Sequence, residues 1–108
     1  GGSDLNQLYQ TIMGRDIDLQ GDHYWSEQLD AGQASLADVA GALVRSSEFE
    51  SLGLESVSDT VDSFYANGLQ RDADASGLDY WTNTAESTSV EVVAVAIALS
   101  SEAEALWG

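Results

Sequence analysis

The chain has 108 residues, 44% hydrophobic and 8% aromatic, which predicts one folded domain and argues against a disordered chain. Its 19 acidic residues face three arginines and no lysine, giving a formal net charge of −16, and there is no cysteine to form disulfides or thiolate metal sites. Such a surface repels nucleic-acid phosphates and anionic lipids, and the longest apolar run, residues 92–99, is too short to cross a bilayer. We therefore expect no nucleic-acid partner and no membrane insertion.

The chain contains an internal duplication. Residues 14–25 and 70–81 share Arg, Asp, Asp, Gly, Tyr and Trp in one order at an offset of 56, and residues 35–48 match residues 89–102 at an offset of 54. The match predicts a first repeat over residues 4–52 and a second over residues 58–107. Because the connector, residues 53–57, is short and apolar, we expect a single domain over residues 4–108. Residues 1–3 are interpreted as a tag or a frayed terminus.

The first element of each repeat is predicted to be an amphipathic helix. In both copies apolar or small residues recur at i, i+3, i+4, i+7 and i+8, the spacing of one helical stripe. These positions are Leu5, Leu8, Tyr9, Ile12 and Met13 in the first copy and Val61, Phe64, Tyr65, Gly68 and Leu69 in the second.

An acidic turn with one arginine follows each of these helices. A planar guanidinium suits a carboxylate or a helix-end carbonyl. The structural interpretation is therefore that each arginine ties the turn to its own repeat; the functional alternative is an anion-binding arginine. The residues assigned to this structural turn are Arg15, Asp16, Asp18, Gly21, Arg71, Asp72, Asp74 and Gly77.

The first of these turns also has the spacing of a calcium loop. Counted from Asp16, oxygen-bearing side chains and a glycine fall at places 1, 3, 5, 6, 7 and 12 of a twelve-residue EF-hand loop. The candidate ligands are Asp16, Asp18, Gln20, Asp22 and Glu27, with Gly21 at the sixth place. The second copy has Asn83 at the twelfth place, and His23 replaces the usual aliphatic residue at the eighth in the first. Calcium binding is therefore an alternative, and no cofactor is expected otherwise.

A second helix is predicted from Asp18 to about Leu29, with Asp18 as its N-cap and Asp74 in the same role in the second copy. Each of these helices carries a Tyr–Trp pair. Adjacent helical residues point about 100° apart, so only one of each pair can face the centre of the core.

We expect the tryptophan of each pair to be buried, in a core whose aromatic members are Tyr9, Trp25, Tyr65 and Trp81. The paired Tyr24 and Tyr80 should lie at its edge with wet hydroxyls. The alternative is that Tyr24 and Tyr80 are stacking platforms for a sugar.

Two further helices complete each repeat. Ser35 with Asp38 predicts a capped third helix, and its aligned segment, residues 90–99, is predicted to be a helix buried on most sides despite its β-branched residues. Leu43 and Ile97 should join the core. Short fourth helices are predicted from two strict capping-box patterns, Ser47 with Glu50 and Ser101 with Glu104.

No set of residues forms a catalytic signature. There is no Gly-rich phosphate loop and no Ser/His/Asp set, the one histidine, His23, is interpreted as a surface residue, and acidic pairs are too many to single one out. We expect the chain not to be an enzyme.

The repeat pattern resembles a bacterial repeat family catalogued as a domain of unknown function. The residues that carry the resemblance in the first copy are Leu8, Tyr9, Gly14, Arg15, Asp18, Gly21, Tyr24, Trp25, Leu29, Gly32, Ser35, Val39, Leu43, Ser46, Glu48 and Phe49. The second copy departs from the pattern at Gln70 and Ala103. The family is similar to the helical linker domains of phycobilisomes. Its members occur mostly in large secreted or surface proteins, often beside calcium-binding nonapeptide repeats or carbohydrate-active domains.

The predicted fold is therefore all-α, with two tandem helical repeats of about four helices each packed as one compact bundle. The predicted function is a non-enzymatic structural or interaction module of a secreted or cell-surface bacterial protein, with an unidentified protein or polysaccharide as partner. The alternative is a ligand-binding module for calcium or an extracellular polysaccharide.

Overall fold

The computed structural model describes residues 2–107, which form eight α-helices and one π-helical segment, with no strand within that range. The first repeat contributes α1 (Gly2–Met13), α2 (Leu19–Asp30), α3 (Leu36–Val44) and α4 (Ser47–Glu50). The second contributes α5 (Val57–Phe64), its π-helical continuation η1 (Tyr65–Leu69), α6 (Ala75–Ser87), α7 (Val90–Ala98) and α8 (Ser101–Trp107). The predicted all-α fold of two tandem repeats is confirmed. Gly1 lies outside the described residues, and α1 already includes Gly2 and Ser3.

Polar side chains begin the helices at the places where the sequence predicted caps. Asp18 accepts a hydrogen bond from the backbone N–H of Gly21 at 2.6 Å, and Asp74 accepts one from that of Gly77 at 2.7 Å. Ser35 and Asp38 form the reciprocal capping box at the start of α3. These contacts satisfy backbone N–H groups that a helix start leaves free.

The caps of the two short helices correct the sequence prediction by one residue. Ser46, not Ser47, caps α4 by accepting from the backbone N–H of Phe49 at 3.2 Å. In the second repeat Ser100 accepts from the backbone N–H of Ala103 in the same way, also at 3.2 Å. The first turn of each helix carries two glutamates, and the first of them, Glu48 in α4 and Glu102 in α8, meets the arginine described below.

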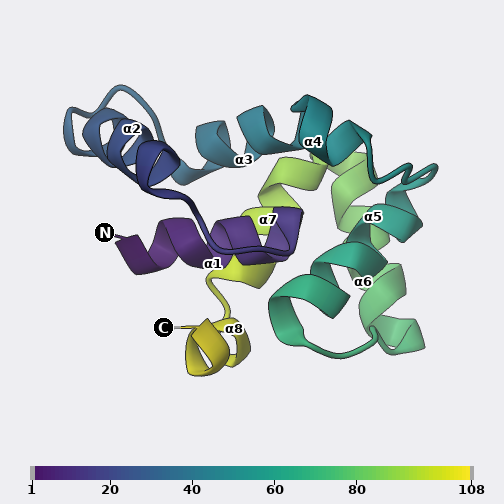
Figure 1. Cartoon of the computed structure of the whole chain (residues 1–108). Coiled ribbons are helices and arrows are strands. Elements are labelled where there is room, and N and C mark those ends of the chain that lie inside the picture. Colours follow the sequence, from purple (N-terminus) through teal and green to yellow (C-terminus); the bar gives the residue numbers. More distant parts are fainter. Residues whose placement is uncertain (1, 108) are drawn as a thin grey trace.

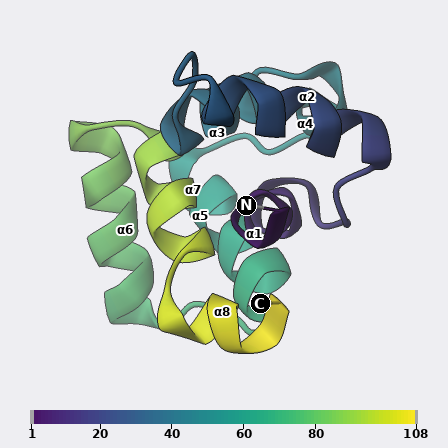
Figure 2. The same cartoon turned by 90° about the vertical axis from the view of Figure 1, so that its left-hand side faces the viewer.

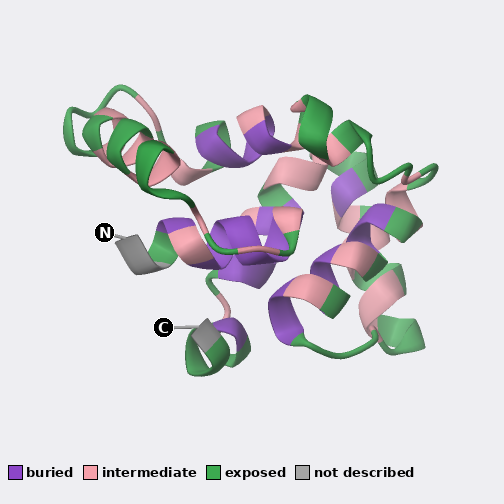
Figure 3. Cartoon of the chain, in the orientation of Figure 1, coloured by how far each residue is buried: buried purple, intermediate pink, exposed green. Residues whose placement is uncertain are grey.

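One hydrophobic core serves both repeats. The buried cluster combines residues of α1 and α3 with residues of α5, η1 and α7, and α1 runs through the middle of the molecule (Figures 1 and 2). Figure 3 shows the buried residues concentrated on these central helices. At the crossing of α1 and η1 the backbone of Gly68 lies so close to Thr11 that an added Cβ would overlap its side chain. The buried amide of Gln7 donates to the carbonyl of Ala98 at 2.7 Å and so joins α1 to α7.

The shared core gives the dimensions of a single domain. The Cα radius of gyration is 13.0 Å, which is the value of about 13 Å expected for a compact chain of this length.

The segment with many β-branched residues is helical, as predicted. Val93 and Ile97 are buried in it, while Val92 and Leu99 on its outer side stay exposed.

The two repeats are not packed reciprocally. α1 lies against α7 and α8 of the second repeat, whereas α5 makes no comparable contact with α3 or α4 in the described part of the chain. An exact two-fold relation between the repeats therefore does not describe the molecule. The first helix also ends differently in each copy: α1 stops at Gly14 with φ +73°, while the second copy continues as the π-helix η1 and stops at Gln70 with φ 59°.

Candidate functional site

Several residues of the repeat signature meet around an arginine in each repeat. In the first repeat Arg15 donates from Nε and Nη2 to the two carboxylate oxygens of Glu48, at 2.7 and 2.9 Å, and from Nη1 to the backbone carbonyl of Asp16 at 3.0 Å. This two-pronged pairing, here called the arginine clamp, ties the turn after α1 to the first turn of α4. It uses the planar geometry of the guanidinium.

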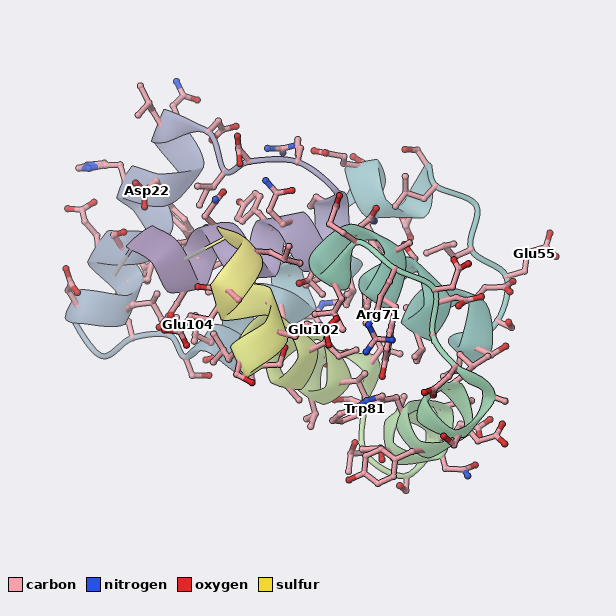
Figure 4. The ribbon with its side chains drawn as sticks, turned by 90° about the horizontal axis from the view of Figure 1, so that it is seen from below. Asp22, Glu55, Arg71, Trp81, Glu102 and Glu104 are labelled. Carbon is pink, nitrogen blue, oxygen red and sulfur yellow. The ribbon has the colours of Figure 1, made fainter. Side chains whose placement is uncertain are left out.

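The second repeat holds the same clamp. Arg71 donates from Nε and Nη2 to the carboxylate oxygens of Glu102, at 2.6 and 3.0 Å, and from Nη1 to the backbone carbonyl of Asp72 at 3.3 Å. Figure 4 shows Arg71 beside α8, which carries Glu102. The prediction that each arginine contacts a carboxylate or a helix-end carbonyl within its own repeat is confirmed, and the partner is a carboxylate in both. The sequence prediction did not pair the arginines with these glutamates: the recurrence of Glu48 and Glu102 at the offset of 54 marks them as repeated positions without identifying them as the partners of the arginines.

Each clamp lies over the ring of a buried tyrosine. The guanidinium carbon is 5.3 Å from the ring centroid of Tyr9 in the first repeat and 5.1 Å from that of Tyr65 in the second, within cation–π range. Both tyrosines are only 6% exposed, so these two predicted core aromatics lie in the core. Burial raises the pKa of Tyr9, and a hydrogen bond with Trp25 acts in the opposite direction.

The clamps perturb the titration of their own members. The hydrogen bonds donated by Arg15 lower the pKa of Glu48, and those from Arg71 lower the pKa of Glu102. In return, each carboxylate raises the pKa of the arginine that it binds. Both pairs remain open to solvent, with side-chain exposures between 39% and 48%, so water screens much of their attraction.

The signature glycines lie where the N-cap and the tyrosine hydroxyl converge. A Cβ on Gly21 would lie 2.9 Å from the Oδ1 of Asp18 and 3.0 Å from the hydroxyl of Tyr9. The second repeat is as tight: a Cβ on Gly77 would lie 2.7 Å from the Oδ1 of Asp74. Glycine is therefore required by close approach at these helix starts.

The Tyr–Trp pairs lie at the edge of the core. Trp25 and Trp81 are partly buried and pack against the core cluster, which corrects the prediction that they are buried in it. The physical reason is that α2 and α6, which carry them, lie on the outside of the molecule (Figure 2). Their neighbours Tyr24 and Tyr80 are 54% and 62% exposed.

Each exposed tyrosine meets its tryptophan edge to face. The ring centroids are 4.8 Å apart in the first repeat and 4.9 Å in the second, with interplanar angles of 76° and 77°. Figures 1 and 2 place α2 and α6 at separate edges of the molecule, so Tyr24 and Tyr80 do not line a common groove.

The candidate calcium ligands are dispersed by the helix that contains them. α2 begins at Leu19, so Gln20, Asp22 and Glu27 lie on a helix instead of wrapping around a loop. Asp16 accepts from the Gln10 amide, Asp18 caps α2, Asp22 accepts from Ser26 at 3.1 Å, and Glu27 lies 3.4 Å from His23. In the part of the chain that the structure describes, no three carboxylate or histidine side chains are placed together to hold a metal ion.

An acidic pocket of about 330 Å³ opens beside α5 in the second repeat. It is lined by Leu54, Asp59, Asp62, Ser63, Ala66 and Asp72. The sequence signal for it is the replacement of Gln10, whose amide binds the carboxylate of Asp16 in the first repeat, by the short Ala66. No described helix is both long and apolar enough to cross a membrane.

Comparison with known proteins adds a family to this geometry. The family described as "Domain of unknown function (DUF4214)" matches residues 5–53 and, a second time, residues 53–107. No curated protein and no solved structure gives a match.

Proposed function

The chain belongs to the DUF4214 family and carries two copies of its domain, and on that premise we propose that it is a non-enzymatic structural or interaction module of a secreted or cell-surface bacterial protein. The observation that carries the proposal is the arginine clamp. In each repeat the signature arginine, tyrosine, aspartate and glutamate bind one another or the backbone beside them.

The signature therefore builds the fold of each repeat. The clamp joins the turn after the first helix to the last helix, while the aspartate and glycine start the helix in between. A motif that presents chemistry to a substrate would direct such groups outward into a cleft. The acidic surface, with a net charge of −16, suits a medium rich in salt or divalent cations, which supports the extracellular setting.

The structural role is tested by conservative substitution of the clamp. We expect Arg15→Lys and Arg71→Lys each to lower the melting temperature by a few degrees, because lysine keeps the charge but cannot bind both carboxylate oxygens in parallel. Arg45→Lys is the matched control, since Arg45 is exposed and forms no ion pair within the described residues. Clamp variants as stable as the parent, or more stable, would contradict the structural role. They would indicate that the arginines serve a binding or other function at a cost in stability.

The extracellular setting has a separate test. An antibody raised against the chain should label intact cells of the source bacterium or detect the parent protein in the medium. Labelling that requires permeabilised cells would contradict this part of the proposal while leaving the structural role intact.

A polysaccharide-binding module is the second candidate, favoured by the exposed tyrosines. Tyr24 and Tyr80 hold equivalent places, and the edge-to-face contact with the neighbouring tryptophan orients each ring. Flat exposed rings can stack on sugar faces. Calorimetric titration with a panel of bacterial exopolysaccharides should then give a signal that Tyr80→Ala weakens and Tyr24→Ala/Tyr80→Ala abolishes. Binding that survives the double variant would exclude the tyrosines as the platform.

A further inference from the structure

The second helices of the two repeats, α2 and α6, pack against the rest of the domain in different ways. α6 packs against both α5 and α7 and buries Ala85, whereas α2 packs against α1 and has no buried residue. Figure 3 shows α2 with intermediate and exposed residues only. The loop from α2 to α3, residues 31–35, is also longer than its counterpart from α6 to α7, residues 88–89, and the repeat offset falls from 56 to 54 at this point. The longer loop allows α2 to lie away from α3.

The turn in front of α2, by contrast, is fastened more firmly than the turn in front of α6. Asn6 accepts from the backbone N–H of Ile17 at 2.9 Å, and the Gln10 amide binds the carboxylate of Asp16. The second repeat has Asp62 and Ala66 at the places of Asn6 and Gln10, and its turn lacks both contacts among the described residues. In the first repeat, side-chain hydrogen bonds hold the turn, whereas α2 packs against one described helix only. In the second repeat, the turn lacks these hydrogen bonds, but α6 packs against two helices.

We propose that α2 is a hinged arm that detaches from α1 as a unit while the rest of the domain stays folded. Segments with few buried apolar contacts open at a lower free energy than the global unfolding of the protein. Opening separates Trp25 and Leu29 from the core cluster. The two hinges lie at the ends of α2: one directly after the fixed turn at Ile17, the other in the loop over residues 31–35. This inference does not depend on the proposed function.

Native-state hydrogen exchange measured by NMR tests the proposal directly. At low guanidinium concentrations, we expect the amides of α2 to show protection factors at least about tenfold lower than those of α6 and α7, with little dependence on denaturant. Equal protection and equal denaturant dependence for α2, α6 and α7 would overturn the proposal, because α2 would then open only with global unfolding.

A matched pair of variants separates local opening from loss of stability. Trp25→Ala removes a contact that both the local opening of α2 and global unfolding break, so it should lower the protection of α2 and of α7 by a similar factor of about five. Trp81→Ala, at the equivalent place in α6, removes a contact that survives the opening of α2, so it should lower the protection of α7 and leave that of α2 unchanged. If Trp81→Ala lowered the protection of α2 and α7 by the same factor, α2 would belong to the global cooperative unit and the hinged arm would be wrong.

Discussion

At the scale of single residues, each repeat depends on a few side chains whose chemistry cannot be exchanged. Arginine is needed because its planar fork binds both oxygens of the glutamate while its face covers a tyrosine ring. Glycine is needed because the tyrosine hydroxyl and the capping aspartate occupy the space that a Cβ would take. These requirements explain why the same residue types recur in both copies although most of the surrounding sequence differs.

The glycine requirement predicts opposite effects of one substitution at two helical sites. Gly77→Ala should destabilise the protein, because its Cβ would lie 2.7 Å from the capping Oδ1 of Asp74 and 3.0 Å from the hydroxyl of Tyr65. Gly41→Ala is the matched control: its Cβ would meet only the flexible end of the Arg45 side chain, so the gain of up to about 1 kcal/mol in helix propensity should prevail. Thermal unfolding of both variants checks this, and equal effects of the two substitutions would contradict the steric argument.

The clamp glutamates predict a loss of stability in acid. Arg15 and Arg71 lower the folded-state pKa values of Glu48 and Glu102, so the clamps contribute fully above the unfolded-state glutamate pKa of about 4.3. Their contribution is lost as the pH falls through the lower folded-state values. The measurement is the melting temperature of the parent minus that of Glu48→Gln/Glu102→Gln between pH 7 and pH 3. This difference should be positive at neutral pH and shrink below about pH 4; a constant difference would mean that the carboxylate charge contributes nothing.

At the scale of helices, equivalent segments differ in what they pack against. α3 and α7 both lie in the core and contact each other, so their apolar residues are buried alike. α2 and α6 share the Tyr–Trp pair and the aspartate cap, but only α6 has two neighbouring helices. The same local sequence therefore gives the same helix and a different energetic role.

Alanine substitution of the two tryptophans measures this difference between α2 and α6. Because Trp81 is partly buried, Trp81→Ala should cost about 2 kcal/mol, less than the 3–5 kcal/mol typical of a fully buried tryptophan. Trp25→Ala should cost about 1 kcal/mol of global stability, since α2 contacts fewer helices. Chemical denaturation of the two variants gives both values, and a larger loss for Trp25 would reverse the order argued for α2 and α6.

At the scale of the whole molecule, burial of one shared core stabilises the fold, and repulsion between the many carboxylates destabilises it. Residues of both repeats form the same buried cluster, so neither repeat contains a complete core of its own. The net charge of −16 is spread over a small domain, and the carboxylates repel one another in the compact state. The protein should therefore unfold in a single transition whose midpoint depends on ionic strength.

Salt and calcium can be separated by experiment. Sodium chloride should raise the melting temperature by screening, since the Debye length is about 10 Å at 0.1 M. Millimolar calcium should stabilise only as much as magnesium at equal ionic strength, because α2 disperses the candidate ligands. A calorimetric titration with calcium in a magnesium background checks this. A stoichiometric signal at micromolar affinity that Asp16→Ala or Glu27→Ala removes would establish a specific calcium site instead.

The sequence by itself determined the local and repeated features of this protein. The helix stripes, the aspartate caps, the place of each arginine turn and the helical state of residues 90–98 follow from spacing and duplication, and these act within one repeat. Only the tertiary structure decided features that depend on contacts between distant segments: the glutamate partner of each arginine, the partial burial of Trp25 and Trp81, and the weak attachment of α2. Two copies of one repeat cannot occupy identical surroundings without exact symmetry. α1 therefore lies at the centre of the molecule, whereas its copy, α5 with η1, lines an acidic pocket.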